Sequence, residues 1–226
     1  MMMDYTSIII NSFRKASNPE IAKGQSAYMK NHFEFYGLKS PERKQLQRLF
    51  FKKDELLKKE KLPEVIKKLW EAPQRELQYC GQELALKYIK NQEEKDIHLY
   101  EYMITHKSWW DTVDFIASNL VSRYFKTYPD NKWDTCQKWL LSEHLWLQRT
   151  SLLFQLKYKN NLDTELLEHN IKFLLDSNEF FINKAIGWIL REYSKTNSEW
   201  VLAFVEKHDL HKLSKREALK WLSRKK

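Results

Sequence analysis

The sequence predicts an all-helical protein built from repeated helical hairpins, and three observations support this fold class. Leu, Lys, Glu and Trp are abundant, whereas only 4 Gly and 5 Pro interrupt the 226 residues. Apolar residues recur with the period of an α-helix along most of the chain. No segment alternates apolar and polar residues for long enough to indicate a sheet. We therefore expect no β-strand of four or more residues.

Helix-sized segments follow one another with short breaks. Ser40-Pro41 and Ala72-Pro73 are typical helix starts, because Pro is tolerated at the first helical position. The expected helices are residues 5–16, 19–30, 41–52, 63–71, 74–90, 93–105, 109–126, 130–140, 143–158, 164–176, 179–194, 198–207 and 214–224. Pairing them gives units of roughly 32 to 39 residues, the size of HEAT-like repeats. We expect a single domain, residues 1–226, whose hairpins stack into a curved solenoid with a basic concave groove.

Charge and composition narrow the functional classes. Lys and Arg outnumber Asp and Glu by 39 to 30, and the net charge of +9 favours a polyanionic partner such as nucleic acid. No glycine-rich phosphate loop is present. Cys80 and Cys136 lack a CxxC partner, and His208 and His211 lack further ligands, so we expect no metal and no cofactor. Without a secretory or membrane-spanning apolar run, we expect a cytoplasmic monomer.

The second helices of the hairpins can be aligned. Residues four apart share one face of a helix, so two aligned rows form a stripe along one surface. The rows are Arg75, Trp110, Arg149, Lys184 and Arg216, and then Tyr79, Asp114, Leu153, Trp188 and Lys220. Cations pair with phosphates, and aromatic faces pack on sugars or bases, so the stripe is expected to face DNA. Five other tryptophans are assigned to packing: Trp70, Trp139, Trp146, Trp200 and Trp221.

The segment His106–Phe115 carries the candidate chemistry. Ser108 and Asp111 have the spacing of a capping box, with Ser108 as the N-cap. Asp114 lies beyond the cap, four residues after Trp110. Its carboxylate is either a surface group or one held over the same groove as the indole. The positive end of the helix would help to keep it ionised.

Two runs, Lys107–Asp114 and Phe181–Glu192, resemble signature segments of the DNA alkylation repair (AlkD-like) glycosylases, which are HEAT-like solenoids. The similarity extends over nearly the whole chain and is weaker before residue 60. It implies that Asp114 is the catalytic carboxylate and that Trp110 and Trp188 line the groove. It also implies DNA contacts by Arg149, near the lesion, and by Tyr28. Arg191, in the second run, is assigned to DNA binding with Arg75, Lys184 and Arg216.

The resemblance implies base excision repair of double-stranded DNA: hydrolytic release of cationic N3- and N7-alkylated purines without base flipping. A cationic base is already a good leaving group, so a fixed carboxylate can stabilise the developing oxocarbenium charge and place a water. Tryptophan faces attract cations. No lysine has the surroundings of a Schiff-base former, so a monofunctional hydrolase is favoured over a lyase.

Two other classes remain open. The chain could be a non-catalytic DNA- or RNA-binding module that uses the basic stripe for recognition alone. It could also be a protein-interaction scaffold, the usual role of helical repeats. A scaffold predicts an apolar or acidic groove, and a binding module predicts that Asp114 is dispensable for base release.

Overall fold

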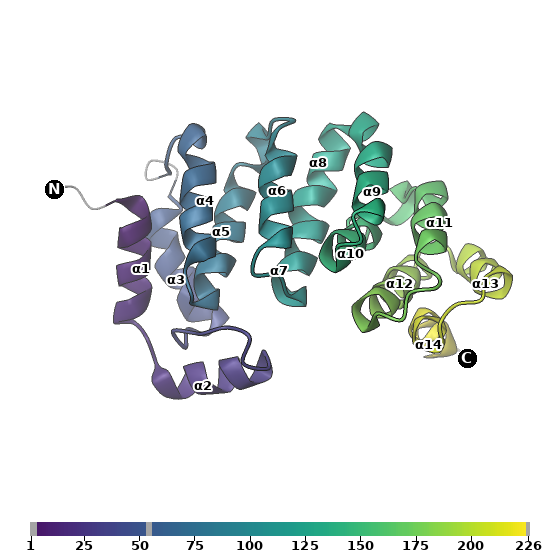
Figure 1. Cartoon of the computed structure of the whole chain (residues 1–226), viewed down its shortest axis with the longest axis horizontal. Helices are drawn as coiled ribbons and strands as arrows, with labels where there is room; N and C mark the ends of the chain where they lie inside the picture. The colour runs from purple at the N-terminus through teal and green to yellow at the C-terminus, as the bar shows by residue number, and fades with distance from the viewer. Residues whose placement is uncertain (1–3, 53–55, 225–226) are drawn as a thin grey trace. The chain divides into compact units, whose positions relative to one another are not determined.

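The computed structural model describes residues 4–52 and 56–224, and this part of the chain is all-helical (Figure 1). Its one β feature is an isolated bridge between Glu34 and Gln74. The predicted fold class is therefore confirmed. None of the described helices is long and apolar enough to cross a membrane.

The chain divides into two compact units, Met1–Glu93 and Glu94–Lys226, and each is described by itself. The expectation of one domain over residues 1–226, with a groove along all of it, stays a prediction. The helices of the first unit are α1 (Tyr5–Lys15), α2 (Pro19–Tyr28), α3 (Ser40–Phe50), α4 (Leu62–Glu71) and α5 (Arg75–Lys87). In this unit α4 packs on α5, and Trp70 is fully buried, as expected for a packing tryptophan.

One buried carboxylate holds the segment between α2 and α3 against α5. The backbone amides of Tyr36, Gly37 and Leu38 donate hydrogen bonds of 3.0, 2.9 and 3.1 Å to the carboxylate of Glu76. Three such donors offset the cost of burying a charged group. This contact fixes the chain that follows α2, a helix with no buried residue, which ends at the exposed Tyr28.

The second unit consists of two rows of helices. Its elements are α6 (Asp96–Thr105), α7 (Trp110–Phe115), a π-helical segment (Ile116–Val121), α8 (Ser122–Thr127), α9 (Lys132–Leu141), α10 (Leu145–Leu153), α11 (Thr164–Phe173), α12 (Phe180–Tyr193), α13 (Ser198–Lys207) and α14 (Lys212–Leu219). The second helices of the hairpins, α7, α10, α12 and α14, pack on one another in sequence, as in an α-helical repeat solenoid. The helix expected over 109–126 is the continuous rod α7–π–α8 (Figure 1).

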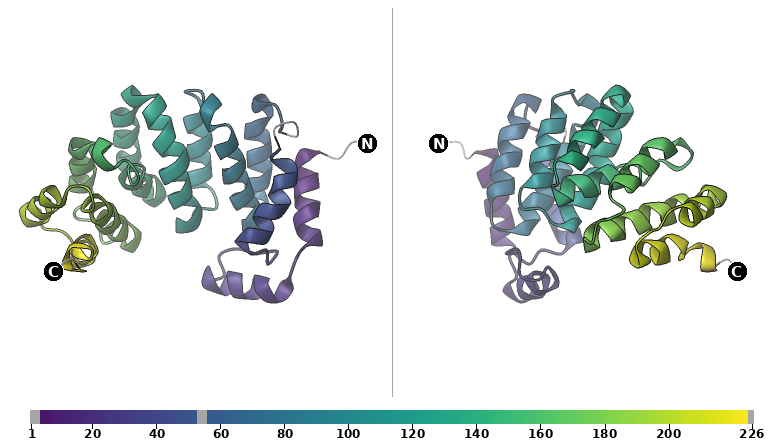
Figure 2. Two further views of the ribbon diagram at one scale, coloured as in Figure 1. Left: turned by 180° about the vertical axis from the view of Figure 1, so that it is seen from behind. Right: turned by 45° about the vertical axis from the view of Figure 1, so that its right-hand side comes forward.

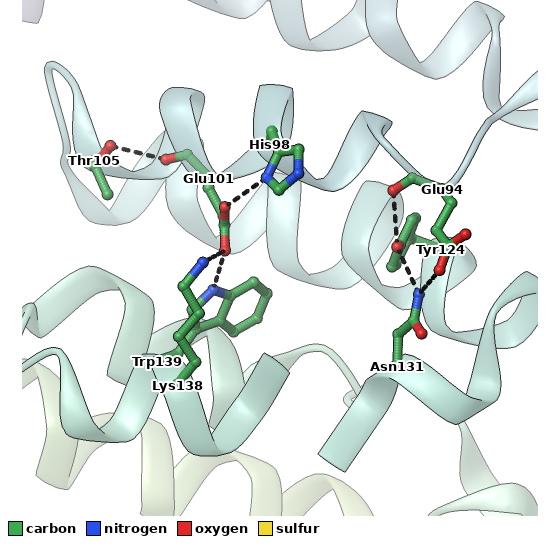
Figure 3. A network of polar contacts seen from close by, with 8 residues as sticks. All are labelled: Glu94, His98, Glu101, Thr105, Tyr124, Asn131, Lys138 and Trp139. Carbon is green, nitrogen blue, oxygen red and sulfur yellow. Dashed lines mark hydrogen bonds and ion pairs between the residues drawn. The ribbon is translucent and has the colours of Figure 1, made fainter. Parts of the chain in front are cut away.

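Polar contacts join the first helices of neighbouring hairpins (Figure 3). The indole Nε1 of Trp139 on α9 donates to the Glu101 carboxylate on α6 at 2.8 Å, and Lys138 pairs with the same carboxylate at 3.5 Å. At the other end of α6, Asn131 donates to Glu94 at 2.8 Å. Trp139 is fully buried, which agrees with its assignment to packing. These contacts fix the register between the two hairpins.

The helix ends follow local rules at some positions and depart from them at others. The helix at Ser40-Pro41 begins one residue earlier than expected, at Ser40, so Pro41 is its second residue. Pro73, however, lies outside α5, because Gln74 is the N-cap and Arg75 the first helical residue. The Arg75 amide donates instead to Glu34 O at 2.8 Å, so a contact with a distant segment sets this helix start.

Gly187 allows α12 and α14 to lie side by side (Figure 2). A Cβ atom at this position would lie 2.5 Å from Cβ of Glu217 and 2.9 Å from the carbonyl oxygen of Ser214. Gly187→Ala is therefore expected to force the helices apart and to lower the free energy of unfolding by about 1–3 kcal/mol in urea denaturation.

Gly24 on α2 provides the control, because a Cβ atom added there would have no neighbouring atom within 4 Å. Gly24→Ala should leave stability unchanged or raise it by up to about 1 kcal/mol through helix propensity. Equal stability of Gly187→Ala and the wild type would contradict the close approach of the two helices.

Candidate active site

The candidate catalytic carboxylate, Asp114 on α7, forms a bidentate ion pair with Arg149 on α10. Arg149 Nε lies 2.8 Å from Asp114 Oδ1, and Nη2 lies 2.9 Å from Oδ2. The remaining terminal nitrogen, Nη1, donates to the carbonyl oxygen of Phe181 on α12. The Arg149 side chain is 4 % exposed and that of Asp114 16 % exposed. One guanidinium thus links three successive hairpins.

Burial and pairing act in opposite directions on Asp114. Burial raises the pKa of its carboxyl group above the ordinary value, the nearby Asp111 charge adds to this, and the Arg149 guanidinium opposes both. Both carboxylate oxygens accept hydrogen bonds from Arg149, which is the arrangement of an ionised group. The result is a fixed, largely desolvated negative charge with a small accessible edge.

An aromatic cluster surrounds the buried side of this ion pair. The ring centroids of Trp109 and Phe181 are 5.2 Å apart, and those of Trp146 and Phe181 are 5.0 Å apart. The Phe181 ring also lies 5.8 Å from Cζ of Arg149. Trp146 was expected to be a packing residue, and it is 8 % exposed. Trp109 and Phe181 were missed as neighbours of the site, although both lie in the signature runs.

The start of α7 differs from the expected capping box. Ser108 Oγ donates to the carbonyl oxygen of Ile104 on α6 at 2.6 Å, and Trp109 is the N-cap residue, without a side-chain cap. The assignment of Ser108 as the N-cap is therefore wrong. Lys107 has a φ of 47°, and this left-handed turn directs Ser108 back to the preceding helix. Trp110 is the first residue of α7, partly exposed, four residues before Asp114.

Trp188 on α12 is partly exposed and lines a cavity of about 640 Å³. Tyr193 and three lysines, Lys157, Lys159 and Lys195, also line this cavity, whereas Asp114 does not. Separate chain segments supply the lining, which explains why no local sequence pattern indicated it.

Two of the arginines expected to contact DNA are buried. Arg75 has no exposed surface, and its Cζ lies 3.9 Å from the centre of the Phe33 ring. Arg149 is 3 % exposed, with its donors directed to Asp114 and Phe181. Leu153, in the second aligned row, is also fully buried. Neither guanidinium is open to a phosphate in this structure, because protein acceptors or aromatic rings surround both.

The other expected DNA contacts are accessible. Tyr28 is 73 % exposed, and Arg216 lies on the surface of α14. Lys184 and Arg191, both on α12, share the carboxylate of Glu217 at 2.9 and 2.8 Å. This carboxylate partly compensates the charge of the two cations. In residues 4–52 and 56–224, no group of three or more His, Cys, Asp or Glu side chains could hold a metal ion.

Comparisons with known proteins agree on one family. The sequence model of the family described as DNA alkylation repair enzyme matches residues 9–222. A solved structure described as a predicted DNA alkylation repair enzyme from Enterococcus faecalis is similar, with a TM-score of 0.86 and 33 % sequence identity. The match covers 92 % of this chain and 97 % of that one. No curated protein matches the chain.

Proposed function

Because the chain belongs to the DNA alkylation repair enzyme family, we propose that it is a monofunctional DNA glycosylase. Its proposed substrates are cationic N3- and N7-alkylated purines in double-stranded DNA, and its reaction is hydrolysis of the N-glycosidic bond. The observation that carries this proposal is the fixed carboxylate of Asp114, held by Arg149 and placed four residues after the partly exposed Trp110.

The chemistry requires little from the protein apart from charge placement. Alkylation at N3 or N7 makes the base cationic, so the base leaves without protonation by an acid. Positive charge then develops on the deoxyribose, and a preorganised carboxylate stabilises it more strongly than water would. The same carboxylate can accept a proton from the attacking water. Because these events occur at the sugar, we propose that the base need not enter a pocket.

The tryptophans and arginines take different roles in this proposal. The indole faces of Trp110 and Trp188 would pack on the sugar and attract its developing positive charge. Arg149, buried under Asp114, acts as a positioning residue for the carboxylate. Tyr28, Lys184, Arg191 and Arg216 are proposed contacts to the DNA backbone, where their charges or hydroxyl group can meet phosphates.

Incubation of the protein with duplex DNA containing N7-methylguanine tests this function. We expect free N7-methylguanine in the supernatant and an abasic, uncleaved strand. DNA containing uracil, a neutral base, should release nothing. Tight DNA binding without any release of methylguanine would contradict the glycosylase and favour the binding module instead.

A further inference from the structure

The cavity beside Trp188 is lined by both cationic and apolar side chains. Lys157 and Lys159 line it together with Trp188 and Leu156. A third lysine, Lys195, also lines it, but its ammonium group pairs with the carboxylate of Glu192. The net positive charge of the cavity therefore resides on Lys157 and Lys159.

Lys157 is held in place by a neutral partner. Its Nζ atom donates to Asn119 Oδ1 at 2.9 Å, and Asn119 Nδ2 donates in turn to the carbonyl oxygen of Phe115 at 2.8 Å. Asn119 lies in the π-helical segment that follows the catalytic helix α7. An amide oxygen orients the ammonium group without neutralising it, so the charge remains available to an anion.

Lys159 adds a second cation to the same cavity. Its side chain is exposed, and its backbone has a φ of 52°, in the left-handed region that Asn also tolerates. An exposed lysine and an oriented lysine thus line one cavity.

The cavity lies along the same seam as the catalytic ion pair. Asn119 follows Asp114 by five residues on one continuous rod, and Lys157 follows Arg149 by eight residues. The pairs Asp114–Arg149 and Asn119–Lys157 are therefore successive contacts between the same two chain segments. Five residues are little more than one turn of this rod, so the two contacts are close enough to meet neighbouring nucleotides of one DNA strand.

Building on the glycosylase function proposed above, we propose that this cavity is a phosphate subsite for the lesion-containing strand. Lys157 and Lys159 bind a backbone phosphate within two nucleotides of the damaged base, beside Trp188, which packs on the deoxyribose of the damaged nucleotide. The subsite sets the position of the strand relative to Asp114, whereas Asp114 carries the chemistry.

The salt dependence of DNA binding tests the subsite. Lys157→Ala should lower affinity about tenfold, as expected for a lost charged hydrogen bond, and should flatten the log–log salt slope by about 0.9. Lys157→Arg should retain both values.

Lys159→Asn should flatten the slope similarly while keeping the fold, because Asn tolerates a positive φ. Lys172→Ala, an exposed lysine on α11, is the matched control and should change the slope little. An equal slope for Lys157→Ala and the wild type overturns the subsite.

Single neutral phosphates locate the contact. In duplexes with a tetrahydrofuran abasic analogue at the lesion position, one methylphosphonate replaces each neighbouring phosphate in turn. For the wild type, one position within two nucleotides of the analogue should lose affinity, and Lys157→Ala should be insensitive at that position. Equal losses in both proteins at every position overturn the proposal. These measurements involve no base release, so a protein that binds in this way but releases no methylguanine keeps the subsite and loses the glycosylase.

Discussion

Replacing Asp114 by Asn is expected to slow the release of N7-methylguanine by on the order of a hundredfold or more, while DNA affinity changes little. The amide keeps the shape of the carboxylate and one acceptor for Arg149, but it removes the negative charge that we propose stabilises the sugar cation. Single-turnover assays with excess protein isolate the chemical step, and fluorescence anisotropy with the abasic analogue measures binding.

Asp111 provides a matched control for this substitution. It lies on the same short helix, α7, three residues before Asp114. Asp111→Asn also removes one carboxylate from this helix, but it leaves the pair of Asp114 and Arg149 in place. The rate of base release should therefore stay within a few-fold of the wild type. Base release by Asp114→Asn at the wild-type rate would show that the carboxylate has no part in the reaction. Equal losses in the two variants would show that the effect is not specific to Asp114.

Replacing Arg149 by Met is expected to destabilise the protein by about 3–5 kcal/mol at neutral pH, because it leaves a buried carboxylate without its partner. The same change should raise the pKa of Asp114 further, since the guanidinium is the group that lowers it. The acid limb of the pH–rate profile should therefore move to higher pH. As pH falls, Arg149→Met should lose base release at a higher pH than the wild type, because the reaction requires the ionised carboxylate.

The pH dependence of stability follows from the same shift. The pKa of Asp114 is raised in the folded protein, so between its unfolded and folded values the folded state binds more protons than the unfolded state. The contribution of Asp114 to stability therefore falls as pH rises through this window. In Arg149→Met the folded pKa of Asp114 is higher still, so this pH range reaches further up. The variant should therefore be more stable to urea at about pH 5 than at pH 8.

Arg149→Lys is the companion variant, because it keeps a positive charge but not the bidentate geometry. It should fold with a smaller loss and should show an acid limb between those of the wild type and Arg149→Met. Identical pH–rate profiles for all three proteins would show that Arg149 does not set the ionisation of Asp114.

The helices could be predicted from the sequence because each depends mainly on a local pattern. Apolar residues at helical spacing and few breakers located α1, α12 and α13 to within one or two residues at each end. The start of α7 was misread, because a left-handed residue, Lys107, redirects Ser108 to another helix. That contact depends on how two helices lie together, which a capping pattern does not describe.

The candidate site residues were named from the sequence, and their roles stay predictions, but the contacts between them were not foreseen. Asp114 and Arg149 were assigned separate roles, as catalyst and as DNA contact, yet they form one ion pair across 35 positions in sequence. The alignment of repeats placed Arg149 in the same row as Trp110, and nothing in a single sequence specifies side-chain pairing between hairpins. The alignment of the repeat helices placed Arg75 on the DNA-facing stripe, but it is buried. Its aromatic neighbour Phe33 lies 42 positions earlier, beyond the reach of any local pattern.

The π-helical segment Ile116–Val121 affects the direction in which the candidate site residues at the start of its helix face. In a π-helix each backbone amide donates its hydrogen bond to the carbonyl oxygen five residues earlier instead of four. The segment therefore contains one residue more than an α-helix would at the same place. The chain after it is anchored by the buried side chains of Tyr124 and Phe125. Loss of a single residue here would restore ordinary pairing and turn Trp110 and Asp114 by about 100° around the helix axis. The length of this stretch therefore matters as well as its residues, and a relative with an insertion or deletion here would present another face of the helix at the candidate site.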